Sequence, residues 1–501
     1  MASARIAVVA TALLLGGCTV GPDYHAPVVE MPTAYSSAEP ATPTADDPAV
    51  WWQAFRDPVL DDLVARAMAG NLDIQQAASR VKQARAQEQA TRAAGGPSVN
   101  ASAQAGYTRL SSNALPSALA NFGTGNTGSG SGGPGIGLAG EDFATFQTGF
   151  DASWELDLFG GQRRANEAAG ARVAAAVWSQ RDAQVLLASE VANTYQQLRA
   201  LQRRIAVADE SIAAARDLLG FIEVRSAKGL VTTLDARRQQ QDIQSQIAQR
   251  DDLAAQAEVH VHALGTLLGL APTGLAPTGL AAQLAAAPAA PPDPVAVPAG
   301  LPSDLLQRRP DIRASERQLA AATADIGVAT ADLYPKFSLT GALQLASRSL
   351  THLLETDSIT ANGAGRLSLP LIGGGASRAT VRLREAQANE ALLAYQSTVL
   401  GALRDVEDAL TRLAADRRRA ESLRTSLQAA RDASETMQVR YRHGLVAYTD
   451  VLTARQTALS VQDGLAQAEA AAAQDAIALY KALGGGWDER REQQEVERTR
   501  G

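Results

Sequence analysis

The residues that could support metal binding or catalysis are few and scattered in this chain of 501 residues. It contains five histidines and a single cysteine, Cys18. His260 and His262 are two positions apart, which places them on different faces of a helix and argues against a shared zinc ion. No catalytic set of side chains is recognisable. We therefore expect no enzymatic activity, no cofactor and no metal, and the net charge of -7 argues against a nucleic-acid partner.

The cysteine itself has a context typical of lipid attachment. Residues 1–17 contain a positive charge at Arg5 and an apolar run from Ile6 to Leu15, which is too short to span a bilayer. The run ends in Leu15-Gly16-Gly17-Cys18, which resembles the bacterial lipoprotein box. Cleavage would leave Cys18 acylated at the N-terminus. The next residue is Thr19 rather than aspartate, which by resemblance favours the outer membrane; the alternative is an ordinary signal peptide that happens to contain a cysteine.

Four segments alternate apolar and polar residues with the period of a β-strand. We place them at about 98–109, 145–159, 336–346 and 363–372, and each approaches the ~9–11 residues that a tilted strand needs to cross a bilayer. In the second segment the water-facing positions are Gln147, Asp151, Ser153, Glu155 and Asp157. The lipid-facing positions are Phe146, Phe150, Trp154, Leu156 and Leu158. The alternative is a half-buried sheet of a soluble domain, but the long, alanine-rich helices are unlike a covering layer.

Four strands are too few for a closed barrel, because small barrels need roughly eight. Two copies of the chain would supply eight strands around a lumen filled by side chains. Three copies would supply twelve strands and leave room for a passage. If the assembly is a conduit, three or more copies are therefore favoured.

The sequence also repeats itself. The stretch VRSAKGLVTTLDARRQ near 225 matches VRYRHGLVAYTDVLTARQ near 440, so that Gly229 aligns with Gly444. We predict a signal peptide at 1–17, a lipidated extended segment at 18–56, a first repeat at 57–270, a Pro-rich linker at 271–302, a second repeat at 303–487 and a solvated charged tail at 488–501. Each repeat holds a short helix, two strands and two long helices, the latter at about 161–227 and 232–268, then 375–442 and 448–483.

Each pair of long helices is predicted to turn at one of the aligned glycines. Apolar residues spaced by seven from Val191 to Leu219 indicate coiled-coil packing of the helices. The turns are followed by apolar pairs, Leu230 and Val231 in the first repeat and Leu445 and Val446 in the second. Apolar residues at an exposed turn either dock another protein or pack between the two helices.

Several motifs in order along the chain closely resemble the outer-membrane factor family, the TolC-like exit ducts of tripartite efflux pumps. They are the lipoprotein box, WWQAFRDPVL at 51–60, GLPSDLLQRRPDIR at 300–313, the strand end SWELDLFGG and the turn RYRHGLVAYTDVL. The resemblance covers nearly the whole mature chain and is to the lipoprotein branch that works with resistance-nodulation-division pumps.

The resemblance implies a mixed α and β fold and a homotrimer. Twelve strands would form one transmembrane β-barrel in the outer membrane, continuous with a periplasmic α-helical barrel. A periplasmic adaptor would dock on the Gly229 and Gly444 turns and link the duct to an inner-membrane pump. No reaction would be catalysed.

The periplasmic gate departs from the family pattern. The family often places a leucine and an aspartate after the second turn, where this chain has Thr449 and Thr453. The gate candidates are therefore Tyr448, Thr449, Asp450, Thr453 and Asp235, although Asp450 is equally consistent with an acid at a helix N-terminus. A type I protein-secretion duct and a periplasmic adaptor lipoprotein remain alternatives to the efflux duct.

Overall fold

The computed structural model describes residues 19–36, 48–109, 142–271, 280–285, 297, 300, 302–369 and 374–487. Cys18, the signal peptide, most of the linker and the charged tail lie outside the described residues. The chain divides into two compact units. The strand unit comprises the described residues up to His25 together with Arg85–Ala171 and Ala320–Glu390. The helical unit comprises Ala26–Ala84, Arg172–Leu319 and the described part of the chain from Ala391 onward. Each unit draws on both predicted repeats, so the division into repeats stays a prediction.

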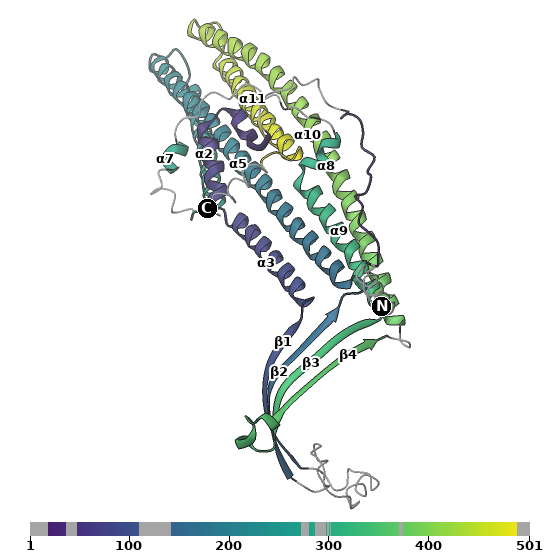
Figure 1. The fold of residues 1–501 in the computed structure, drawn as a ribbon. Coiled ribbons are helices and arrows are strands. Elements are labelled where there is room, and N and C mark those ends of the chain that lie inside the picture. Colours follow the sequence, from purple (N-terminus) through teal and green to yellow (C-terminus); the bar gives the residue numbers. More distant parts are fainter. Residues whose placement is uncertain are drawn as a thin grey trace, which may run out of the picture. The chain divides into compact units, whose positions relative to one another are not determined.

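The strand unit contains a four-stranded antiparallel sheet. Its strands are β1 (Ser98–Arg109), β2 (Asp142–Leu156), β3 (Lys336–Ser347) and β4 (Ile359–Ser368), paired in the order β1-β2-β3-β4 (Figure 1). β2 begins and ends earlier than the predicted 145–159, and β4 lies earlier than the predicted 363–372. The prediction began at Gly363, so it missed the first four residues of β4, and it ran past Ser368, where the strand ends. β1 and β4 are the two edges of this sheet.

Four long helices account for most of the described chain. They are α5 (Gly161–Ala227), α6 (Thr233–Leu267), α10 (Gly375–Arg442) and α11 (Tyr448–Ala482), and their bounds agree with the predicted ones to within a residue. At ~1.5 Å per residue, α5 and α10 are each roughly 100 Å long. Within the described residues, no helix has both the length and the apolar content needed to cross a membrane.

Shorter helices accompany them. They are η1 (Pro48–Phe55), α2 (Pro58–Gly70), α3 (Leu72–Ala94), α7 (Leu280–Ala285), η5 (Pro302–Asp304), α8 (Leu305–Arg308), α9 (Pro310–Ala331), η6 (Leu350–His352) and η7 (Thr356–Ser358). The motif WWQAFRDPVL at 51–60 thus falls on η1 and the start of α2, and the motif at 300–313 falls on η5, α8 and the start of α9.

The main hydrophobic core lies in the helical unit. Val191 and Leu198 of the predicted heptad series are fully buried, and Ile212 nearly so. The WWQAF motif contributes Trp51, which is buried and stacks on Tyr480 with 5.2 Å between ring centroids. Burying such a side chain stabilises the fold by about 1.5–3 kcal/mol. The motif that marked the family in the sequence therefore has a packing role.

Candidate functional site

The pairing of the strands separates the polar from the apolar residues of the sheet. On one face, Asp151 lies opposite Asn100 and Ala342, and Glu155 lies opposite Ser338. On the other face, Phe150 lies opposite Ala101 and Leu343. The same alternation continues from β3 into β4, where Phe337 meets Leu367 and Ser338 meets Arg366. The predicted two-sided sheet is confirmed, because all three pairings keep like residues on one face.

Hydrogen bonds link side chains across the polar face. The Asn100 amide donates to Asp151 over 3.3 Å, and the hydroxyls of Ser98 and Ser153 are 2.8 Å apart. Gln147 also bonds Gln344. The structure thus brings Gln147, Asp151, Ser153 and Glu155 together on one surface, as predicted, while their place in a lumen stays a prediction.

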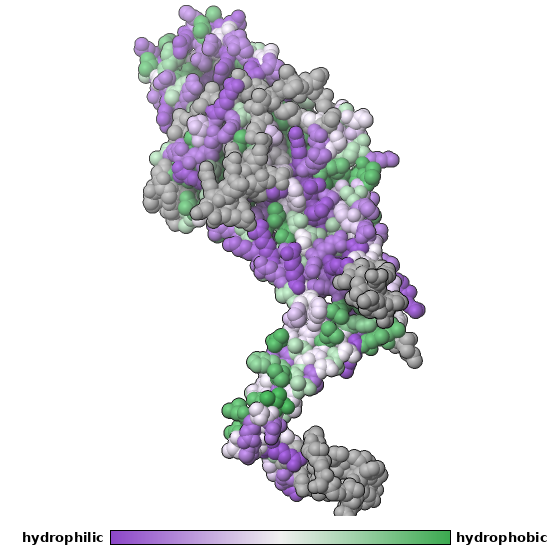
Figure 2. Space-filling model, viewed as in Figure 1, coloured by the Kyte–Doolittle hydropathy of each residue, from purple (hydrophilic) through white to green (hydrophobic). Residues whose placement is uncertain are grey.

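Among the described residues of the strand unit, none forms a layer over the apolar face. Phe150 is 59% exposed, and Leu339, Leu343 and Leu367 are exposed beside it. The space-filling view shows hydrophobic side chains gathered along the strands (Figure 2). A 330 Å³ groove on this part of the sheet is lined mainly by apolar residues, including Phe150, Leu343 and Ile359. An uncovered apolar sheet face is typical of contact with lipid or with another protein.

Asp157 does not belong to the polar face, so that prediction is wrong. β2 ends at Leu156. The Asp157 carboxylate accepts the backbone N–H groups of Gln162 at 3.1 Å and Arg163 at 2.9 Å. It therefore serves the first turn of α5, where the N–H groups lack helical partners and a negative charge is favourable. Leu158 likewise lies beyond the strand.

The two aligned glycines end α5 and α10 in the same way. Gly229 has φ 70° and Gly444 has φ 74°. The following leucines, Leu230 and Leu445, donate backbone N–H bonds of 2.9 Å to Arg225 and Arg440 respectively. This is the bond from the second residue past the helix to a carbonyl five residues back that accompanies a left-handed glycine cap. The sequence match therefore reflects one turn geometry used twice.

The two residues of each apolar pair at these turns have different surroundings: the leucine is exposed and the valine is packed. Leu230 is 62% exposed and Leu445 is 73% exposed. Val231 and Val446 instead pack on a small core of Ile222, Tyr441, Tyr448 and Val451. The packing reading therefore holds for the two valines, whereas docking of another protein on the exposed leucines stays a prediction.

The structure argues against Tyr448 as a gate residue. Its side chain is buried in the tip core and its hydroxyl bonds Gln239. Burial, with a smaller effect of Asp242, raises the pKa of Tyr448 to about 12. An aromatic residue in the first turn of α11 is covered because it faces Tyr441 and Ile222. It lines no water-filled surface of this chain.

The other gate candidates remain accessible. Thr449, Asp450 and Thr453 are exposed and Asp235 is half-buried. Asp450 also accepts the backbone N–H of Ala447 over 3.1 Å, so it does cap α11. The carboxylate keeps further acceptor positions free for a partner or an ion.

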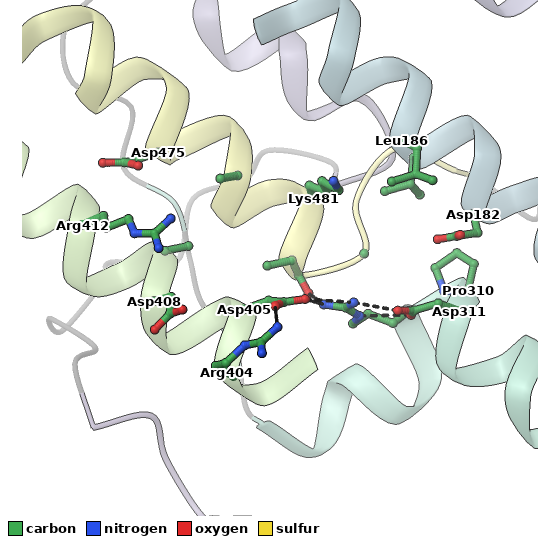
Figure 3. A pocket seen from close by; sticks show the side chains of 16 residues that line it. Asp182, Leu186, Pro310, Asp311, Arg404, Asp405, Asp408, Arg412, Asp475 and Lys481 are labelled. Atoms are coloured by element: carbon green, nitrogen blue, oxygen red, sulfur yellow. Dashed lines mark hydrogen bonds and ion pairs between the residues drawn. The ribbon is translucent and has the colours of Figure 1, made fainter. Parts of the chain in front are cut away.

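Sequence reasoning did not find a charged cavity of about 580 Å³ in the helical unit. Figure 3 shows its acids and bases arranged around one space between α5, α9, α10 and α11. They are Asp182, Arg309, Asp311, Arg404, Asp405, Asp408, Arg412, Asp475 and Lys481. Arg309 pairs with Asp311 at 2.6 Å and with Asp405 at 3.5 Å.

Two acids of this cavity hold protons unusually well. Burial, and then the neighbouring Asp311, raises the pKa of Asp182 to about 6. Burial, and then the hydrogen bond and charge of Asp416, raises the pKa of Asp475 to about 6. In the part of the chain that the structure covers, no group of acids and histidines is arranged to hold a metal ion. The cavity is a region of mixed charge between helices rather than an evident ligand site.

A family model described as outer membrane efflux protein matches residues 63–270 and 301–485. The chain belongs to the outer membrane efflux protein family. The match begins in α2 and runs through both pairs of long helices, so it covers the strand faces and both turns. The predicted family, efflux function and outer-membrane location are thereby confirmed.

Curated relatives extend over nearly the full length of this efflux protein. It is 30% identical over 493 residues to the cation efflux system protein CusC of Escherichia coli O6:H1, with 95% of this chain and 98% of that protein covered. It is 30% identical over 495 residues to the pyoverdine export outer membrane protein OpmQ of Pseudomonas aeruginosa, covering 98% and 99%.

Solved structures share its fold. The outer-membrane channel OprN matches with a TM-score of 0.83 and 32% identity over 94% of this chain and all of that one. The open state of the Neisseria gonorrhoeae MtrE outer membrane channel matches with a TM-score of 0.78 and 26% identity, covering 94% and 99%. The efflux protein is thus similar to channels throughout its length.

Proposed function

We propose that three copies of this efflux protein form the passive exit duct of a tripartite pump. The observation that carries the proposal is the sheet, which has a polar face, an uncovered apolar face and two edge strands. Edge strands present unpaired N–H and C=O groups that pair readily with another strand. Pairing β1 of one copy with β4 of the next would close twelve strands, with Gln147, Asp151, Ser153 and Glu155 toward the lumen.

The two turns are the proposed docking tips for a periplasmic adaptor, which in turn would bind an inner-membrane pump. Leu230 and Leu445 would supply apolar contacts from the rigid caps of α5 and α10. Val231 and Val446 would act indirectly by holding the tip core together. Thr449, Asp450, Thr453 and Asp235 are the proposed gate residues, and Cys18 the proposed site of acylation.

The cargo is proposed to be small molecules rather than secreted protein. Both curated relatives named above are exporters of small solutes by their names, a cation efflux protein and a pyoverdine exporter. A type I protein-secretion duct would use the same fold, because fold does not determine cargo. Loss of small-molecule resistance without loss of any secreted protein, in a strain lacking this chain, would separate the two.

The decisive experiment is purification from outer membranes, followed by mass measurement of the unboiled assembly and single-channel recording in a planar bilayer. We expect roughly three times the 52.3 kDa of one chain, and a steady ion conductance. A monomer without conductance refutes the duct.

The docking tips have a separate test. Leu445→Asp should abolish in-cell cross-linking to the periplasmic adaptor while leaving the conductance of the purified channel intact. Leu72→Asp is the control, because Leu72 is likewise an exposed leucine but lies at the start of α3, away from the turns. Equal cross-linking by wild type and Leu445→Asp would exclude the tip as the docking site.

A further inference from the structure

We propose that Arg164 builds an intramolecular docking site for residues Thr19–Asp23, and that this site fixes the point at which the lipid anchor leaves the protein. Arg164 lies in the first turn of α5, next to the end of β2. The proposal rests on the proposed acylation only for its second half, because the docking itself is a matter of the described residues. All of these residues belong to the strand unit.

The guanidinium of Arg164 is committed almost entirely to this segment. Its side chain is only 5% exposed. Nε donates to the carbonyl of Val20 over 3.2 Å, and Nη2 donates to the carbonyl of Gly21 over 3.4 Å and to the Asp23 carboxylate over 2.6 Å. Nη1 donates to the Glu167 carboxylate over 2.8 Å. A buried guanidinium is tolerated only when its donors are matched, and here three of the four partners come from the segment.

The backbone of the segment fits closely between α5 and α9. Val20 donates its N–H to the carbonyl of Phe159 over 3.1 Å. Gly21 has φ 90°, and a Cβ there would lie 2.4 Å from the Cα of Gly327. A Cβ on Gly160 would lie 2.9 Å from the Cα of Thr19. Real Cβ atoms do not approach other atoms so closely, so the site requires glycine at these positions and admits one backbone path.

The site lies where the two-faced sheet meets the polar helices. Phe159 stacks on Tyr334 with 4.8 Å between ring centroids, and the indole of Trp154 donates to the carbonyl of Gly95 over 3.0 Å. Aromatic side chains of this kind gather at the boundary between lipid and water. The docked segment therefore begins at the level of the sheet that corresponds to the membrane surface.

Docking changes what a lipid anchor can do. Five undocked residues would let the start of the chain wander over roughly 17 Å. When Arg164 holds the same residues in place, the start of the chain leaves the protein at one fixed position beside β2 and β3. The acyl chains would then insert next to the sheet rather than at the end of a loose tether.

The first test measures docking by hydrogen–deuterium exchange of the full-length protein from membranes. Arg164→Gln should speed exchange of the Val20 amide at least tenfold, and Arg164→Lys should do the same because an ammonium cannot reach both carbonyls and the carboxylate. Glu167→Gln, which removes only the charge of the fourth partner, should leave the exchange rate of the Val20 amide within about threefold of wild type. Unchanged Val20 exchange in Arg164→Gln overturns the docking site.

Gly21→Ala keeps the proposal testable if Arg164→Gln fails to fold. It alters the segment and leaves α5 intact, and its Cβ would collide with Gly327. We expect it to release the segment as Arg164→Gln does. Retained protection of Val20 in Gly21→Ala also overturns the site.

The second test locates the anchor with a fatty acid that carries a photoreactive diazirine. In wild type, cross-links from the acylated N-terminal peptide should fall mainly on the peptides around Trp154–Gly160 and Tyr334–Phe337. Arg164→Gln should reduce them severalfold at unchanged acylation, and Glu167→Gln should not. An unchanged cross-link map overturns the positioning role, whereas a wild type without any acyl group refutes lipid attachment and leaves the exchange test to decide docking.

Discussion

Placing a positive charge on either side of β2 tests the two-faced sheet directly. Phe150 and Asp151 are adjacent in the middle of the strand and point to opposite faces. Phe150→Arg puts a guanidinium on the apolar face, which at the midplane of a bilayer costs about 2–4 kcal/mol. Asp151→Arg loses the 3.3 Å hydrogen bond from Asn100 on a wet surface, which costs under about 1 kcal/mol. The first variant should thus lose about 30- to 1,000-fold in its folding equilibrium, and the second less than tenfold.

The measurement is urea unfolding of each variant in lipid vesicles, together with the amount of protein recovered in outer membranes. Phe150→Leu is the control, since it keeps the face apolar and should behave nearly as wild type. If Asp151→Arg destabilises the protein as much as Phe150→Arg, the assignment of the two faces is wrong.

Three further predictions concern the helices. Gly444→Ala should destabilise the tip by about 1 kcal/mol, because φ at Gly444 is 74° although a Cβ there would meet nothing within 4 Å. Gly220→Ala is the control and should be neutral or stabilising, because Gly220 is equally free of neighbours and has no positive φ. The measurement is hydrogen exchange of the Leu445 amide, and equal exchange rates in the two variants would contradict the prediction. Tyr448→Phe should lower the free energy of unfolding by roughly 1–3 kcal/mol, because it leaves the buried side-chain oxygen of Gln239 without its donor. Tyr107→Phe, which loses an exposed hydrogen bond to Asp142, should lower it less. Comparable shifts of the melting temperature in the two variants would argue against the tip core. Burial raises the pKa of Asp182 in the folded protein to about 6, above its usual 3.8, so its protonation stabilises the fold below pH 4 and this contribution is lost as the pH rises through 6. In Asp182→Asn the melting temperature should therefore depend less on pH over this range than in wild type. Parallel pH profiles of the melting temperature in the two proteins would contradict the assignment.

The strand faces and long helices could be predicted because each has a strong local period. The alternation in β2 and the seven-residue spacing in α5 both survive in the packing, since one face of each element is apolar. β4 was misplaced because its prediction rested on the alternation that continues through Leu367 and Leu369, whereas the strand ends at Ser368. Asp157 was misassigned because it continues the alternation by chance and yet caps the helix that follows.

The candidate site was predictable only where the sequence repeats or resembles a family. The turns at Gly229 and Gly444 were found because they match each other. The burial of Tyr448 was not, because it depends on Tyr441 and Ile222 from other helices. The cavity around Asp182 combines residues from four helices that are far apart in the sequence, so no local pattern announces it.

The composition of the two units constrains how this protein is made. The strand unit needs residues near the N-terminus and others as late as Glu390, and the sheet that β1 begins is not complete before Ser368, the end of β4, has been synthesised. Most chains finish an N-terminal domain while synthesis continues. This one cannot, so some three hundred residues must travel through export unfinished, with the apolar faces of two early strands awaiting partners. Keeping those faces from aggregating until the later strands arrive is therefore a requirement of the interleaved topology.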